Sequence, residues 1–135
     1  MRLAALVVGL TAALAACTSS MPTSPSTPLN LQLTLAAGET AAVQGTSTRL
    51  RFLSVSGDSR CPVDAVCIQG GDALVRIDVV PADGGPSATY DLHTGSMQPV
   101  LHRNLTIALV ELRPYPFSGR SIPPDEYRAT FRIMR

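Results

Sequence analysis

The stretch DALVRIDVV (residues 72–80) alternates apolar and mostly polar side chains and decides which fold class the sequence predicts. Its apolar face is formed by Ala73, Val75, Ile77 and Val79. Successive side chains of a β-strand point to opposite faces, so this alternation is typical of a strand that buries one face. Residues 72–80 are therefore predicted to form one half-buried strand of a sheet.

The same alternation recurs near both ends of residues 29–135. LNLQLTL (29–35) places leucine at every second position, and YRATFRI (127–133) places its apolar and aromatic side chains on one face. Weaker strand patterns lie at 40–44, 48–56, 87–93 and 104–113. In the last of these the apolar phase shifts between Leu109 and Val110, which predicts a β-bulge.

Turn sequences separate these strands, among them Gly70-Gly71 and PADGGP (81–86), and no helical period follows residue 28. About seven short strands joined by turns predict an all-β domain: a single antiparallel β-sandwich of immunoglobulin-like size, with a small β-barrel as the alternative. With no Trp and only three Phe, the core is expected to be mainly aliphatic.

The N-terminus has the pattern of an export signal. Met1-Arg2 is followed by the apolar run LAALVVGLTAALAA (3–16). As a helix this run would span about 21 Å, which is too short for the ~30 Å core of a bilayer. Residues 1–16 are therefore predicted to be a secretory signal peptide.

The end of this run, Leu14-Ala15-Ala16-Cys17, resembles the lipobox of bacterial lipoproteins. The resemblance implies a diacylglycerol thioether at Cys17, cleavage before it and acylation of the new amino group. Residues 18–28 (TSSMPTSPSTP) have the composition of a disordered tether, so residues 17–28 would link the lipid to the domain at 29–135. The expected location is the cell envelope, at the periplasmic face of the outer membrane if the host is Gram-negative, because Thr18 replaces the usual retention aspartate.

With Cys17 lipidated, Cys61 and Cys67 remain as a pair in an oxidising compartment, where disulfides persist. A bond between them would close the loop between the strands at 48–56 and 72–80. Asp58 and Asp64 are candidates to accept hydrogen bonds from loop amides. Redox catalysis is the weaker alternative, because its usual spacing is Cys-x-x-Cys at a helix start.

Metal binding is a second alternative interpretation. Zinc would need further ligands, and the sequence offers only His93 and His102. His93, Met97 and His102 lie within ten residues and carry the imidazole and thioether groups that suit copper. The ordinary explanation is two exposed loop histidines and a core or loop methionine, so no cofactor is expected.

Charge and motif content point away from nucleic-acid binding and catalysis. All 11 basic residues are Arg, and removal of Arg2 with the signal peptide leaves ten against ten acidic residues. This balance indicates neither nucleic acid nor an anionic membrane face as a partner. Glu111, Asp125 and Glu126 are too isolated to suggest a paired-carboxylate hydrolase, and no nucleophile motif is complete, so no catalytic residue is expected.

The run Asp58-Ser59-Arg60-Cys61-Pro62, followed by Cys67 and Gly70-Gly71, resembles a block shared by an uncharacterised family of small bacterial exported proteins, many of them lipoproteins. Leu112-Arg113-Pro114-Tyr115-Pro116 adds to this similarity. The family often carries an aromatic residue after the second cysteine, where this chain has Ile68. The resemblance implies export and fold, but no activity.

Two pairs of residues are candidates for loop bracing or binding. Asp58 and Arg60 either brace the cysteine loop or present it to a partner. Tyr115 and Phe117 stand in a proline-rich loop, where capping of the core is favoured over anchoring of a protein partner. The sequence thus favours a lipid-anchored, non-catalytic envelope domain that binds a protein or envelope component, with a lipoprotein for copper or a small ligand as the alternative.

Overall fold

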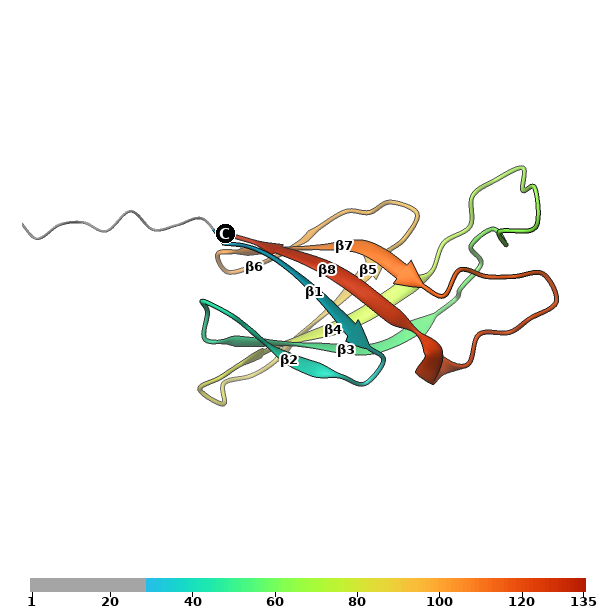
Figure 1. Ribbon diagram of the computed structural model, residues 1–135. Helices are drawn as coiled ribbons and strands as arrows, with labels where there is room; N and C mark the ends of the chain where they lie inside the picture. Colours follow the sequence, from blue (N-terminus) through green and yellow to red (C-terminus); the bar gives the residue numbers. More distant parts are fainter. Residues whose placement is uncertain (1–28) are drawn as a thin grey trace, which may run out of the picture.

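The computed structural model describes residues 29–135, which form two four-stranded antiparallel sheets that are not closed into a barrel (Figure 1). One sheet has the order β1-β8-β7-β6 and the other β2-β3-β4-β5. The elements are β1 (Asn30–Ala36), β2 (Thr40–Val43), β3 (Thr48–Ser56), β4 (Leu74–Pro81), β5 (Ala88–His93), β6 (Val100–His102), β7 (Leu105–Arg113), a short 3₁₀ helix η1 (Pro124–Glu126) and β8 (Arg128–Met134). The predicted antiparallel β-sandwich is confirmed. The predicted signal peptide, Cys17 and the tether lie outside the described residues.

The core lies between the inner faces of the two sheets, as the alternation predicts. Ala73, Val75, Ile77 and Val79 are all fully buried. On the facing sheet Phe131 of β8 packs edge-to-face against Phe52 of β3, with ring centroids 6.1 Å apart. Aromatic pairs in this geometry add to the free energy gained by burial alone.

Two details of the strands depend on local backbone geometry. The register of β7 against β8 shifts between Leu109 and Glu111, which confirms the predicted bulge. A second shift, between Phe52 and Ser54 of β3, was not predicted. The structure also has eight strands where about seven were expected, because β6 spans only three residues and is too short to show an alternation.

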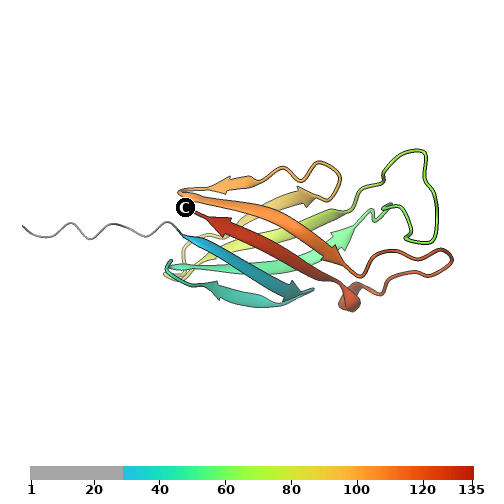
Figure 2. The ribbon, with the colours of Figure 1, turned by 45° about the horizontal axis from the view of Figure 1, so that its top comes forward.

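The two ends of the sandwich differ. At one end Leu29 precedes β1, and its carbonyl accepts a hydrogen bond from the backbone N–H of Arg135 (3.1 Å). At the other end lie the cysteine loop (residues 57–73, between β3 and β4) and the proline loop (residues 114–123, between β7 and η1), as Figures 1 and 2 show. We call these two loops together the tip. Between residues 29 and 135 no helix is long and apolar enough to cross a membrane.

Candidate binding surface at the tip

The cysteine loop is closed by a disulfide. Cys61 and Cys67 are bonded, with their Cα atoms 6.0 Å apart, which confirms the predicted pair. Closing so short a loop contributes about 2 kcal/mol in the chain-entropy estimate, because it removes conformations from the unfolded chain.

A buried ion pair fixes the start of the same loop. The Arg60 guanidinium donates to both carboxylate oxygens of Asp58, with Nε–Oδ1 at 2.9 Å and Nη2–Oδ2 at 2.7 Å. The two side chains are only 10% and 12% exposed. Tyr127, the residue before β8, donates its hydroxyl to Asp58 Oδ2 at 2.8 Å. We call Asp58, Arg60 and Tyr127 the brace.

The brace ties the cysteine loop to the end of β7. Arg60 Nη1 donates to the carbonyl of Leu112 (2.6 Å), and Nη2 donates to the carbonyl of Pro114 (3.0 Å). Arginine suits this position because its planar guanidinium offers several donors in a fixed geometry. Among the described residues no buried side-chain nitrogen or oxygen lacks a hydrogen-bond partner, so the ion pair is fully satisfied.

The brace also shifts the protonation equilibria of its members. Burial acts to raise the pKa of Asp58, but the hydrogen bonds from Arg60 and Tyr127 outweigh it and leave that pKa below its ordinary value. Burial, and then the hydrogen bond to Asp58, raise the pKa of Tyr127 to about 12. The carboxylate is therefore charged and the phenol neutral throughout the physiological pH range.

The other end of the cysteine loop is fixed by backbone contact. Ser59 N–H donates to the carbonyl of Asp72 at 2.7 Å, and Ser59 Oγ also bonds the backbone of Asp72. Gly71 packs so closely here that a Cβ atom on it would overlap the carbonyl group of Ser59, whereas Gly70 has open space around it. Of the two adjacent glycines, only Gly71 is sterically required.

Asp72 is the centre of a second group of hydrogen bonds, at the surface; we call it the Asp72 cluster. Its side chain accepts hydrogen bonds from Thr94 Oγ1 (3.1 Å) and from the backbone N–H of Gly95 (2.8 Å), and it contacts His93 Nδ1 at 2.6 Å. The bond with His93 and then the Gly95 amide lower the pKa of Asp72 to about 2. This cluster orders the turn that follows β5.

Besides the bond from Arg60 to the Pro114 carbonyl, two further hydrogen bonds join the loops of the tip. Val63 N–H donates to the carbonyl of Pro116 (3.0 Å), and Ser118 N–H donates to Asp64 Oδ1 (2.8 Å). Asp58 Oδ1 accepts from the Arg60 amide at 3.2 Å, so both aspartates bond loop amides as predicted. The partner of Asp64, however, lies in the proline loop and not in its own loop. The two loops therefore form one structural unit.

Apolar side chains are unusually exposed on this unit. Val66 and Ile68 are fully exposed, at 102% and 105% of the reference area. Of the seven large apolar side chains that are exposed within residues 29–135, the tip carries five, namely Val63, Val66, Ile68, Tyr115 and Phe117. The others are Met97, near the tip, and Leu101 on β6. Exposed apolar groups gathered in one place mark interaction sites more often than scattered ones do.

The favoured prediction for Tyr115 and Phe117, that they cap the core, is wrong. Both rings are about half exposed. Tyr115 is held from outside the core: its hydroxyl donates to Glu111 Oε1 (2.9 Å), and the Arg113 guanidinium lies 5.4 Å from the ring centroid. Neither ring belongs to the core or to the partly buried side chains packed against it, so both lie at the surface.

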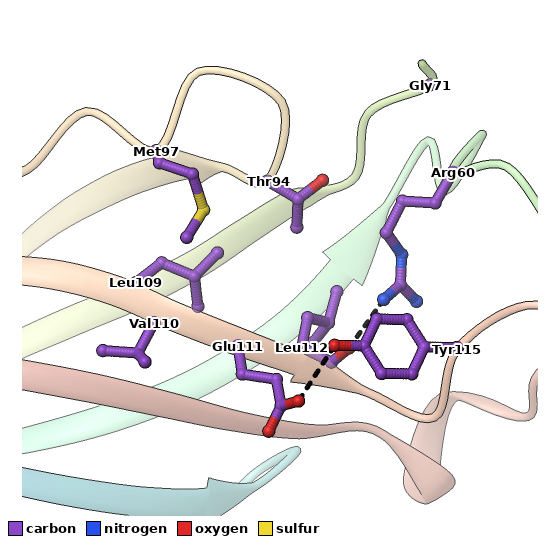
Figure 3. A pocket seen from close by; sticks show the side chains of 9 residues that line it. All are labelled: Arg60, Gly71, Thr94, Met97, Leu109, Val110, Glu111, Leu112 and Tyr115. Atoms are coloured by element: carbon purple, nitrogen blue, oxygen red, sulfur yellow. Dashed lines mark hydrogen bonds between the residues drawn. The ribbon is translucent and has the colours of Figure 1, made fainter.

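A shallow pocket of about 240 Å³ lies between Tyr115 and the open edge of β7 (Figure 3). Met97, Leu109 and Leu112 supply apolar walls, and Arg60 and Glu111 supply polar ones. Its volume is below the roughly 300–1,000 Å³ that is usual for small-molecule sites. The pocket is large enough for a side chain of a partner.

The three candidate metal ligands have different surroundings. His93, at the tip-facing end of β5, is bonded to Asp72, and Met97 lines the pocket. His102 lies near the opposite end of the sandwich, beside Arg135, and its Nδ1 is 2.9 Å from the Tyr90 hydroxyl. Within residues 29–135 no three His, Cys, Asp or Glu side chains are grouped so that they could hold a metal ion.

Several residues at this end of the sandwich have roles that the sequence did not predict. Tyr127 fits the alternating apolar pattern of residues 127–133 and was expected only to pack in the core, so its hydrogen bond to Asp58 was not predicted. The exposure of three apolar residues could have been predicted. A short polar loop closed by a disulfide cannot bury the apolar side chains in it or beside it, here Val63, Val66 and Ile68.

Comparison of the chain with protein-family models, with curated proteins and with solved structures found no match. What the tip does must therefore follow from its own geometry and chemistry.

Proposed function

We propose that this chain is a lipid-anchored, non-catalytic domain of the cell envelope that binds a protein partner through its tip. One observation carries the proposal: the exposed apolar side chains of Val63, Val66, Ile68, Tyr115 and Phe117 gather on two loops at one end of the sandwich. Protein interfaces are organised around such groups, with aromatic residues enriched at their centres.

The rigidity of the tip supports binding. The disulfide, the brace and the two further hydrogen bonds between the loops hold the apolar groups in place before a partner arrives. A surface that is already ordered loses less conformational entropy on binding than a flexible loop does. Charged residues around the apolar groups, among them Asp64, Arg113 and Arg120, supply a polar rim that can select the partner.

The position of the tip is compatible with a lipid anchor. The lipobox-like sequence before Cys17 supports attachment at the N-terminal side, and Leu29 enters the domain at the end opposite the tip. A membrane attachment on that side leaves the tip accessible. In a Gram-negative host the lipid would hold the domain at the periplasmic face of the outer membrane.

The test is crosslinking in intact cells, with the full chain carrying Val66→Asp and Ile68→Asp together. A charge at each position should remove the crosslinked adduct that the wild-type chain gives. The affinity for the partner should fall about 30-fold if the two side chains contribute at least 2 kcal/mol to the free energy of binding. The matched control is Leu101→Asp, because Leu101 is also exposed (72%) but lies on β6. An adduct that survives the tip substitutions, or that Leu101→Asp removes equally, would contradict the proposal.

A further inference from the structure

Strand β1 is an edge strand without the usual protection against pairing. Among the four edges of the two sheets, β6 has three residues, β2 has four, and β5 carries Asp91 in an ion pair with Arg76. In contrast, β1 has seven residues, NLQLTLA, with no charged residue and no proline. It pairs with β8 over its full length without a bulge. Natural edge strands are usually shortened, charged or bulged to prevent association.

Hydrogen bonds at the ends of β1 show which backbone groups face outward. Leu29 accepts from Arg135, and Ala37 donates to Tyr127, so the odd-numbered residues of this segment bond toward β8. In an antiparallel ladder the N–H and C=O of a residue point to the same side and alternate along the strand. The even-numbered residues, Asn30 to Ala36, therefore point their N–H and C=O groups away from β8.

The last of these outward-facing residues is already occupied. Ala36 N–H donates to Glu39 Oε2 (2.7 Å), and Glu39 N–H donates to the Ala36 carbonyl (2.9 Å). Within residues 29–135 no hydrogen bond on this side reaches the backbone of Asn30, Gln32 or Thr34. The available edge is thus a short ladder centred on Gln32.

We propose that a second copy of this chain pairs with this edge, antiparallel, with Gln32 on the twofold axis. Asn30 then faces Thr34 of the second copy, Gln32 faces its own counterpart, and each residue exchanges both backbone hydrogen bonds. Leu31 faces Leu33 of the second copy on the core side, where both are only partly buried in the single chain.

The strand fits itself in this register. The outward side chains are neutral and polar, so no like charges meet across the axis. The sheet that contains β1 then continues from one copy into the other, and the same surface of each copy forms the interface, which makes the dimer isologous. The antiparallel register places the two tips at opposite ends of the dimer, and neither tip loop is part of the paired strand.

The register is tested by cysteine substitutions in the purified full chain under a mild oxidant, so the result does not depend on where the chain resides. Gln32→Cys places two thiols opposite each other and should give a disulfide-linked dimer on a non-reducing gel. Asn30→Cys is the matched control on the same strand: its counterpart is displaced by four residues, about 14 Å, which is too far for a disulfide. Gln44→Cys, on an exposed turn, controls for collision.

We expect a dimer fraction for Gln32→Cys at least about tenfold above that of both controls. Equal crosslinking of the three variants would overturn the pairing. A second measurement uses the size of the full chain in mild detergent. Gln32→Lys should convert the dimer to a monomer, because two like charges would meet at the axis, while Gln44→Lys should not. A wild-type monomer, or a dimer that Gln32→Lys leaves intact, would also overturn the pairing.

Discussion

Two aspartates at the same end of the sandwich have similar partners but different surroundings. Asp58 bonds Arg60 and Tyr127, and Asp72 bonds His93, Thr94 and a backbone amide. The pKa of each lies below its ordinary value. However, the Asp58 side chain is 12% exposed and that of Asp72 is 42% exposed.

The difference shows why a lowered pKa is not a measure of structural importance. Water screens the Asp72–His93 pair and can replace either partner, so its loss should cost little. Water has less access to the Asp58–Arg60 pair, so removing one member leaves a charge that water solvates only in part. The brace should therefore carry the stability of the tip, and the Asp72 cluster should only order one turn.

The largest effect is expected for Arg60→Ala. This change removes the guanidinium from the Asp58 carboxylate, which keeps only Tyr127 and a backbone amide, and leaves the carbonyls of Leu112 and Pro114 without that donor. It should lower the free energy of unfolding by about 3 kcal/mol. Urea denaturation at pH 7 measures it. The matched control is Arg76→Ala, because Arg76 pairs with Asp91 in solvent and its removal should change stability little. Equal losses of stability in the two variants would show that the brace stabilises the fold no more than an exposed ion pair does.

The second largest loss of stability is expected for Gly71→Ala, because Gly71 packs against the backbone of Ser59, next to Asp72. A Cβ atom would push the Ser59 backbone away and break its hydrogen bonds to Asp72, at about 2 kcal/mol. Gly70→Ala, one residue earlier in open space, is the control and should be nearly neutral. Thermal unfolding of both variants makes the comparison, and a Gly70→Ala protein as unstable as Gly71→Ala would count against this packing.

Tyr127→Phe should cost about 1.5 kcal/mol, because it removes a hydrogen bond to a buried carboxylate. It should also change the alkaline limb of the stability profile. The folded pKa of Tyr127, about 12, exceeds its ordinary value of 10, so its contribution is complete below pH 10 and is lost as the pH rises to 12. Urea midpoints from pH 8 to pH 12 should fall less steeply in Tyr127→Phe than in the wild-type chain. If the urea midpoints depend on pH equally in both proteins, the loss of stability at high pH does not come from ionisation of Tyr127.

The smallest effect is expected for Asp72→Asn, less than about 1 kcal/mol at pH 7, since the cluster is exposed. Its pH dependence has the opposite sign to that of Tyr127. The folded pKa of about 2 lies below the ordinary 3.8, so the contribution is present above pH 3.8 and is lost as the pH falls to 2. Between pH 5 and pH 2, the free energy of unfolding should change less with pH in the variant than in the wild-type chain. A loss of stability at pH 7 as large as that of Arg60→Ala would refute the distinction between the two aspartates.

The features that the sequence predicted are those set by neighbouring residues. Alternation located the inner faces of β4 and β8 and the bulge after Leu109, because the period of a strand is local. The pairing of Cys61 with Cys67 followed from the cysteine count and a short separation. β6 was missed because three residues cannot establish a period.

The features that were missed depend on contacts between distant residues. Arg60 reaches carbonyls 52 and 54 residues further along the chain, and Tyr127 reaches back 69 residues to Asp58. No local pattern encodes these distances. The exposure of Phe117 likewise depends on how its loop is held by distant residues, such as Arg60 through the Pro114 carbonyl.

The proposed role of the tip is tested most directly by placing a photo-crosslinking amino acid at a single position of the full chain in living cells. Val66 on the tip and Leu101 on β6 are the two positions to compare, because both side chains are well exposed. Binding through the tip predicts one adduct of defined mass from Val66 and none from Leu101. No adduct from Val66, or the same adduct from both positions, would contradict it.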